Sequence, residues 1–318
     1  MVKCKVCGKE FKEDKNLHFH IKAHKLSISE YYHTQFPRYD KHTNELIKFK
    51  NKEQYFSSDF NNKRNLKTWL KSIPTFEAQK YCKNLLIKRK EEKGLLYSPS
   101  EVELRTLPMP PIPFYQELFG DYYRLCEDIG YKNKFKKVPV KKDHKETFTK
   151  EHLIYIDSRE QNPLDIEDFP TEVKGLKFGD YCLNDKEKTQ NTYIERKSVP
   201  DLIGTLSSGL ERFKNEINRA AEEKAYMVVL VERNLADWLA FNKLKHVYKK
   251  NTRVTPDFIF HNVRDLIQEF PHIQFLFVNG RDECVRIVKK LLLSDVLKEK
   301  HDLQLAYELK LLWEIKYF

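Results

Sequence analysis

The sequence predicts a mixed α/β domain in its second half, preceded by a small metal-binding module and a short helical region. Three observations carry this prediction. From residue 151 onward, short β-branched and apolar runs alternate with amphipathic stretches, which is typical of a central sheet flanked by helices. Two cysteines and two histidines near the N-terminus have the spacing of a metal site. Between these regions, prolines interrupt short helical patterns.

The positive charge of the chain is concentrated in its first half. The 318 residues carry a net charge of +11. Residues 1–150 hold 32 Lys and Arg against 19 Asp and Glu, which is +13, and residues 151–318 hold the other 26 against 28, which is −2. This asymmetry predicts a polyanion-binding region joined to a second activity, with a solvated lysine-rich surface as the alternative.

Several classes of protein are excluded by the composition. No segment has the ~18–20 consecutive apolar residues that a membrane span needs. Residues 1–5 lack the apolar run of a signal peptide, and the six cysteines are not spaced as a secreted disulfide framework. We therefore expect an intracellular protein without membrane contact, in the cytoplasm of a bacterial or phage-infected host rather than in a nucleus.

Residues 1–26 are predicted to form a zinc-bound module. The pattern C-x2-C-x12-H-x3-H is formed by Cys4, Cys7, His20 and His24. Two thiolates from a tight turn and two imidazoles four residues apart on a helix can occupy the corners of a tetrahedron around Zn2+. The segment resembles the two-Cys two-His zinc fingers, whose two core positions are occupied here by Phe11 and Leu17.

The resemblance implies that three positions of the finger would face DNA bases, namely Glu13, Asn16 and Phe19. Asn16 could pair with adenine, whereas Phe19 is a poor reader of base edges. One finger covers only about three base pairs. Docking or a structural cap is therefore an alternative of equal weight to base readout.

The middle of the chain suggests further DNA-binding modules. Residues 27–97 interleave aromatic residues and lysines, which suits either base stacking beside phosphate contacts or an aromatic core with a basic surface, and 76–92 should be helical. In 98–131, a helix capped by Ser98 or Ser100 is followed by four prolines and two short helices. This order resembles the helix-turn-helix-like repeat of homing endonucleases, with a non-binding spacer as the alternative. The eight lysines of 132–150 predict a basic linker.

The α/β pattern extends over residues 151–294. We expect strands at 152–156, 173–178, 181–183, 192–197, 226–232 and 274–279, and helices at 200–207, 210–224, 235–244, 256–270 and 281–293. Residues 295–318 add an amphipathic helix with a stripe of Leu305, Leu309, Leu312 and Ile315. This stripe could pack on its own domain or form a subunit contact in a homodimer.

Acidic residues gather at the ends of the predicted strands. Glu195 and Lys197 are two residues apart, so both project from one face of a strand while Arg196 projects from the other. Asp180 follows Gly179, which allows a sharp turn. Carboxylates from separate strands can hold Mg2+ or Mn2+. A lysine on the same face can orient or deprotonate a water and neutralise charge on the attacked phosphate.

Residues 179–180 and 195–201 match the pattern GD…ERKxxxD. In this the segment resembles the XPF family of structure-specific nucleases, part of the PD-(D/E)xK superfamily with its restriction-endonuclease-like α/β fold. The resemblance implies a Mg2+ or Mn2+ site formed by Asp157, Asp180 and Glu195. It further implies that Glu160 is an auxiliary acid and that Lys197 positions or activates the water. It also implies that Arg196 and Asp201 support the site and that Arg212 lies near DNA.

The resemblance implies a metal-dependent DNA endonuclease that acts on branched, flap or junction DNA in repair or recombination. A sequence-directed mobile-element nuclease and a non-catalytic DNA-binding scaffold are the alternatives. Two departures from the family pattern bear on DNA binding. Glu216 stands where relatives often have Gln, and residues 295–318 contain no glycine, so no helix-hairpin-helix module is expected there. A homodimer through the nuclease domain is expected.

Overall fold

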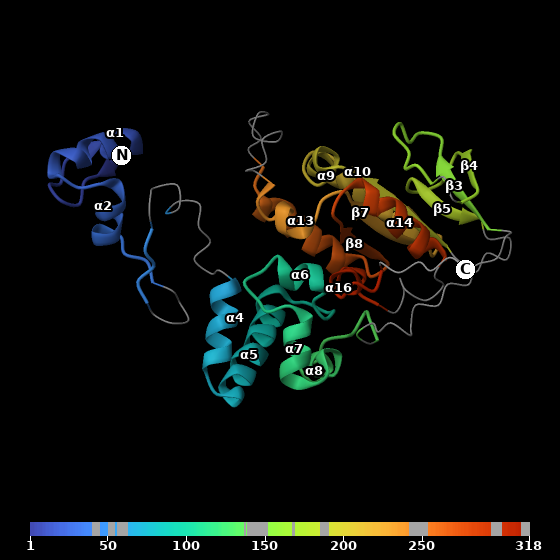
Figure 1. Ribbon diagram of the computed structural model, residues 1–318, viewed down its shortest axis with the longest axis horizontal. Helices are drawn as coiled ribbons and strands as arrows, with labels where there is room; N and C mark the ends of the chain where they lie inside the picture. The colour runs from blue at the N-terminus through green and yellow to red at the C-terminus, as the bar shows by residue number, and fades with distance from the viewer. Residues whose placement is uncertain are drawn as a thin grey trace. The chain divides into compact units, whose positions relative to one another are not determined.

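The computed structural model describes residues 1–39, 45–49, 55, 63–136, 138, 152–166, 169–184, 191–241, 254–293 and 301–312. The chain divides into two compact units. The first consists of Met1–Tyr81 with Pro108–Pro110, and the second of Cys82–Leu107 with Pro111–Phe318. Figure 1 shows the helices and strands of each unit. Among the helices of the described ranges, none is long and apolar enough to cross a membrane.

The first unit begins with the expected ββα finger. An antiparallel hairpin of β1 (Val2–Lys3) and β2 (Glu10–Phe11) is followed by α1 (Asp14–Ile21) and a 3-10 turn, η1 (Lys22–His24). Beyond the finger lie α2 (Ile28–Gln35), α4 (Lys63–Ser72) and the start of α5 (Thr75–Lys93). Helix α2 begins at Ser27, whose hydroxyl accepts a hydrogen bond from the Glu30 amide while the Glu30 carboxylate accepts one from the Ser27 amide.

The core of the finger extends past residue 26, where the sequence suggested a boundary. Leu17 and Ile21 of α1 pack with residues that come from beyond the finger, namely Tyr31, Tyr32, Phe49 and Tyr55. The Tyr31 hydroxyl also accepts a hydrogen bond from the Lys5 amide at 2.9 Å. A finger of this size buries little apolar surface by itself, and α2 enlarges its core. Four of the aromatic residues considered for base stacking are therefore core residues.

The second unit is built on a six-stranded mixed sheet with the order β4-β3-β5-β6-β7-β8. Its strands are β3 (Leu153–Asp157), β4 (Thr171–Lys174), β5 (Tyr181–Asn184), β6 (Thr192–Lys197), β7 (Tyr226–Val231) and β8 (Ile273–Phe277). Strand β5 is antiparallel to both β3 and β6, and the other neighbours are parallel. The predicted α/β fold is confirmed.

Helices cover both faces of this sheet. Their bounds are α9 (Val199–Thr205), α10 (Leu210–Glu222), α11 (Leu235–Trp238), α13 (Pro256–Glu269), α14 (Arg281–Leu293) and α16 (Leu303–Glu308). The side chains of strand β7 alternate between the two helix layers. Met227, Val229 and Val231 pack with α9, α10 and α13, whereas Val228 and Leu230 pack with α14 and α16. Helix α11 is shorter than the expected 235–244, of which residues 242–244 lie outside the described ranges.

The segment 98–131 forms α6 (Glu101–Arg105), α7 (Ile112–Phe119) and α8 (Tyr122–Asp128), and Ser100 caps α6. Helix α6 is not a free module, because its side chains are buried in the second unit. Asp302, which caps α16, accepts a hydrogen bond from the Glu101 amide at 2.6 Å, and Gln268 of α13 donates one to Glu103 at 3.0 Å. The Lys132 amide also donates to the Leu96 carbonyl, so residues 132–136 belong to this unit and not to a linker. Most of 137–150 lies outside the described residues.

The C-terminal amphipathic helix is shorter than expected, and two leucines of its stripe lie in the core. Helix α16 ends at Glu308, and residues 294–300 and 313–318, including Ile315, lie outside the described residues. Leu305 and Leu312 are buried within the second unit, and Leu309 is 38% exposed. Of the two alternatives for the stripe, the structure favours packing on its own domain, since two of the three described stripe residues are buried.

Candidate active site and metal centre

The register of the sheet places three acidic residues of the sequence pattern on one face of the sheet. Tyr181 of β5 pairs with Ile156 of β3 on one side and with Ile194 of β6 on the other. One residue further along each ladder come Asp157, Asp180 and Glu195, and the Asp157 amide donates to the Asp180 carbonyl at 2.8 Å. Directly paired residues of antiparallel strands face the same way, so these side chains share one face of the sheet.

Gly179 makes this close approach possible. It has a φ of +57°, and a Cβ at this position would lie 2.9 Å from the Ile194 carbonyl oxygen. The following residue, Asp180, is then held against β6 by two hydrogen bonds. Its amide donates to the Ile194 carbonyl at 2.8 Å, and its Oδ2 accepts from the Arg196 amide at 2.7 Å. The glycine is required at this point by both its backbone conformation and the space available.

The negative charge of two carboxylates at this site is offset only in part by the nearby Lys197 ammonium group. Burial and the nearby Glu195 raise the pKa of Asp180 to about 7. Burial also raises the pKa of Glu195, although its ion pair with Lys197 opposes this. For Lys197, burial favours the neutral amine, but Glu195 and Asp180 outweigh it and the net pKa is raised. The half-buried Asp180 and the buried Glu195 thus share one ammonium, and a divalent cation bound between them would stabilise their charged forms.

Asp157 lies beside this pair but does not fit as a metal ligand in the observed conformation. Its Oδ1 accepts hydrogen bonds from the amide and the Nε of Arg159, at 2.7 and 2.8 Å. Its Oδ2 accepts from Arg159 Nη2 at 2.9 Å and from the Leu176 amide at 2.7 Å. These four bonds use all the lone-pair positions of a carboxylate. The hydrogen bonds from Arg159 outweigh burial and lower the pKa of Asp157.

A second group of ion pairs lies on the opposite face of the sheet. As strand alternation predicts, Arg196 points away from Glu195, and its guanidinium pairs with Glu160 at 2.9 Å and with Glu232 at 2.6 Å. Glu232 also pairs with Arg281 at 3.1 Å. The family pattern in the sequence includes Arg196 and Glu160. Glu232 and Arg281 were not predicted from the sequence. An acid directly after the buried strand β7 was the available signal for Glu232.

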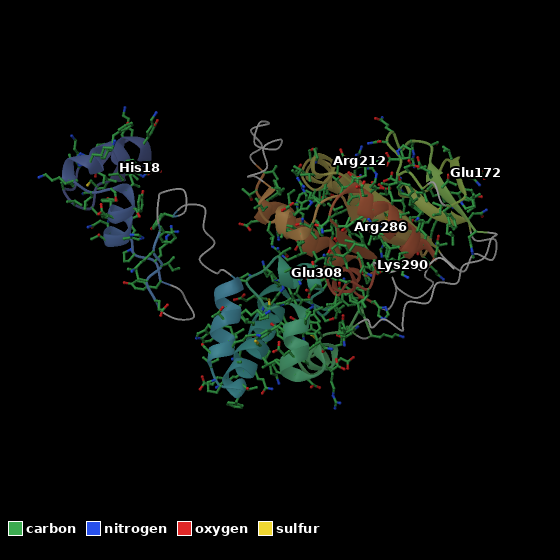
Figure 2. The ribbon with its side chains drawn as sticks, in the orientation of Figure 1. His18, Glu172, Arg212, Arg286, Lys290 and Glu308 are labelled. Carbon is green, nitrogen blue, oxygen red and sulfur yellow. The ribbon has the colours of Figure 1, made fainter. Side chains whose placement is uncertain are left out.

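An open groove of about 580 Å3 is lined by Lys197, by residues of α9 and by Arg212 at the start of α10. Arg212 is labelled in Figure 2. Its polar lining includes Asp201, Thr205 and Ser208. Asp201 is part of the cap of α9, where its amide and carboxylate both bond to the Ser198 hydroxyl. Arg212 is exposed at the far end of the groove, and Glu216, one turn later on α10, is half-buried. The negative charge of Glu216 acts on both Glu195 and Lys197.

The four Cys and His residues of the finger converge as their spacing predicts. Their ligand atoms lie within 4.8 Å of one another, and this is the one such group of three or more potential ligands among the described residues. Cys7 Sγ is 3.1 Å from His20 Nε2, and Cys4 Sγ is 3.5 Å from His24 Nε2. Burial of Cys4 is outweighed by hydrogen bonds from the Cys7 and Val6 amides, which lower the pKa of its thiol. Two sulfurs and two imidazole nitrogens in this arrangement fit a tetrahedral zinc ion.

Comparison with known proteins supports the assignment of the second unit. Residues 156–291 match the model of the ERCC4 domain family. This match covers 136 of the 318 residues, from β3 to α14, and confirms the resemblance to XPF-type nucleases for that segment. It includes every residue proposed for catalysis. The homing-endonuclease repeat has no such support and stays a prediction.

Two solved structures are similar in part. XPF from Aeropyrum pernix is 19% identical with a TM-score of 0.33, and the match covers 44% of this chain and 64% of that chain. The structure described as XPF from Aeropyrum pernix in complex with DNA has 19% identity, a TM-score of 0.31 and the same coverage. The present chain thus spans less than two thirds of these relatives. No curated protein sequence matches it.

Proposed function

We propose that the protein is a divalent-metal-dependent DNA endonuclease that cuts branched, flap or junction DNA. The single observation that carries this proposal is the arrangement of Asp180, Glu195 and Lys197. The half-buried Asp180 directly precedes β5, and the buried Glu195 and the Lys197 ammonium come from the adjacent strand β6, beside an open groove. The ERCC4 match over the same segment supports the class of reaction. The +13 charge of residues 1–150 supports a nucleic acid as substrate.

The residues have distinct roles in this proposal. Asp180 and Glu195 would hold Mg2+ or Mn2+, and a bound cation of this kind polarises a phosphoryl oxygen and favours a hydroxide nucleophile. Lys197, held at Glu195, would orient the attacking water and offset the charge that develops on the phosphate. Asp157 would anchor Arg159 and the loop at Leu176. Its place as a third ligand, implied by the family pattern, would require Arg159 to release it.

The remaining predicted residues would support this centre. Arg196 would fix β6 through Glu160 and Glu232, and Asp201 would fix the start of α9. Arg212, at the exposed end of the groove, would contact a DNA phosphate. The finger would bind Zn2+ as a structural ion. These roles rest on contacts within each unit.

The burial of α6 favours structure-specific cleavage over sequence-directed cleavage. A helix-turn-helix module must leave its helices free to enter the major groove. In the second unit, α6 is covered, with Glu101, Val102 and Glu103 all buried and bonded or packed against the nuclease core. We therefore assign 98–131 as a structural extension of the nuclease unit rather than as a base reader.

A cleavage panel tests the proposal. Flap, fork, Holliday-junction and linear duplex substrates are prepared in two unrelated sequences and incubated with Mg2+, Mn2+ or no divalent ion. We expect metal-dependent cleavage near the branch in both sequences and little cleavage of the linear duplex. A Lys197→Ala protein purified in parallel controls for contaminating nucleases. Cutting of one sequence in all structures would favour the mobile-element alternative, and absence of cleavage in every substrate would contradict the proposal.

A homodimer through the nuclease domain stays a prediction. Its contact would have to use a surface other than the leucine stripe of α16, since Leu305 and Leu312 are buried in their own chain. Sedimentation of the full chain should then give twice 38.2 kDa.

A further inference from the structure

The outward face of the finger helix carries a stripe with an unusual composition. Its helical members, which follow at the spacing of one face, are Lys15, Asn16, Phe19, Lys22 and Ala23, and Lys12 lies in the turn just before the helix; all six are exposed. The opposite side of α1 and η1 holds the buried Leu17 and Ile21 and the imidazoles of His20 and His24. The stripe therefore combines three lysines, one amide and one aromatic ring on a single surface.

The orientation of this stripe is held by contacts on the other side of the helix. His18 Nε2, on the half-buried His18 labelled in Figure 2, lies 3.0 Å from the hydroxyl of the buried Tyr32, and this contact ties α1 to α2. Leu17 and Ile21 are enclosed by the aromatic residues of α2 and beyond. The helix cannot rotate to bury Phe19 without breaking both sets of contacts. Phe19 is consequently left 63% exposed, with the Lys22 ammonium 5.9 Å from its ring centroid.

The chemistry of the stripe matches an unpaired base better than a base pair. A phenyl ring has no hydrogen-bonding group, so it cannot distinguish the edges of paired bases in the major groove. The faces of paired bases are covered by their neighbours, whereas an unpaired base offers a free face for stacking on an aromatic ring. Asn16, one turn before Phe19, can both donate and accept a hydrogen bond at the edge of such a base.

The surrounding charge favours a nucleic acid over an apolar protein surface. Residues 1–39 contain eight Lys and Arg against four Asp and Glu. Lys12, Lys15 and Lys22 stand on the stripe itself, where they can follow a phosphate backbone. A protein partner that covered Phe19 would have to bury or pair these ammonium groups.

We propose that the exposed face of α1 binds single-stranded DNA by stacking an unpaired base on Phe19. This rests on the proposed function, because a branched or flapped substrate supplies the single strand next to the duplex that is cut. The finger then recognises an unpaired flank of the substrate rather than a duplex sequence.

Binding of the full chain to labelled DNA, measured by fluorescence anisotropy without added Mg2+ or Mn2+ and without chelator, tests this. The probes are a single-stranded oligonucleotide, a blunt duplex of equal length, a fork, and single-stranded RNA of the same sequence. Phe19→Ala should weaken binding to the single strand and the fork by about 5- to 150-fold, the range for one lost base–aromatic stack. Binding to the blunt duplex should change less than about twofold. The zinc content should stay at the wild-type value.

Two further variants make the test specific. Phe19→Trp keeps a stacking surface, so it should retain single-strand affinity and show additional fluorescence quenching on binding. Phe76→Ala is the matched control, because Phe76 is 74% exposed at the start of α5 and away from the stripe in sequence. It should leave binding unchanged. Lys15→Gln and Lys22→Gln should each reduce the salt slope on single strands by up to about 0.7, whereas Phe19→Ala should not change it.

The outcomes separate this inference from the proposed function. Wild-type affinity of Phe19→Ala for single strands, an equal loss on blunt duplex, or an equal loss in Phe76→Ala would overturn the inference while cleavage by the intact protein still supported the nuclease. Tighter binding to RNA than to DNA would overturn the choice of DNA. Loss of single-strand binding in Phe19→Ala together with absent cleavage in the wild type would uphold the inference and contradict the nuclease.

Discussion

The two candidate metal-binding regions differ in how their ligands are brought together and held. The four ligands of the finger come from 21 consecutive residues and already lie within 4.8 Å of one another. The acidic residues come from three strands, Asp157 and Glu195 being 38 positions apart, and each of these two is bonded to a basic side chain. Local turns can assemble the first site, whereas the second depends on the register of a sheet.

This difference determines whether the fold or only the activity of each region depends on a bound metal ion. In the finger, metal binding can supply most of the energy of folding. In the nuclease unit, carboxylates close together would repel one another, and the positive charges of Arg159 and Lys197 hold Asp157 and Glu195 in place without a metal ion. We therefore expect the first site to depend on its metal for its fold and the second to depend on its metal for activity alone.

The largest expected effect is the loss of zinc. Closing a finger around zinc contributes roughly 10–16 kcal/mol of apparent free energy at neutral pH, so a zinc chelator should unfold the finger and expose residues 1–39 to protease. The second unit should keep its own melting transition. Cys7→Ser should remove the single equivalent of tightly bound zinc. Stoichiometric zinc in that variant would show that the ligands are wrong.

The next effect is on catalysis. Glu195→Gln, Asp180→Asn and Lys197→Ala should each lower the cleavage rate by about 100- to 1,000-fold with little loss of folded structure, because each charge acts at the reacting phosphate. Asp157→Asn should instead lower the melting temperature and leave the Mn2+ concentration for half-maximal activity unchanged. A large rise in that Mn2+ concentration would restore Asp157 to the ligand set.

A smaller effect is the difference in stability cost between a buried leucine of α16 and an exposed leucine just after the helix. Leu305→Ala should destabilise the second unit by about 2–5 kcal/mol, as expected for a buried leucine. Leu309→Ala, at an exposed position one turn later, should cost no more than about 0.5 kcal/mol. Urea denaturation measures both. If Leu309→Glu converted a dimer to a folded monomer in sedimentation, a subunit contact at α16 would be supported after all.

The smallest effect compares equivalent helix caps in the two units. Ser27 and Ser100 both form capping boxes, with Glu30 and Glu103, but Ser27 is exposed and Ser100 is buried. Ser27→Ala should cost about 0.5–1 kcal/mol, and Ser100→Ala up to about 2 kcal/mol, because the latter also removes a buried hydroxyl that donates to the Glu103 carboxylate. Thermal unfolding resolves the two values. Equal losses would show that burial does not matter at these caps.

Much of the architecture could be predicted because it depends on local patterns. The zinc ligands follow from spacing alone, and the buried strands β6 and β7 and helix α14 appear within one residue of their expected ends. The acidic pattern around Glu195 was likewise visible, since strand alternation places Glu195 and Lys197 on one face and Arg196 on the other. These features are decided by residues close together in the chain.

Other features depended on contacts between distant segments, which periodicity does not reveal. Three such contacts join parts of the chain far apart in sequence. They are the bond of Asp157 to the Leu176 amide, the pairing of Arg196 with Glu232, and the capping of α16 by a residue that also binds α6. From the sequence, the aromatic residues of α2 fitted a stacking surface and a core equally well. In the structure they pack around α1. The sequence by itself determined which chemical groups are present and how they are spaced locally. Only the tertiary structure decided which carboxylates keep free lone pairs and which aromatic ring stays exposed, because burial and partner choice follow from the packing of the whole chain.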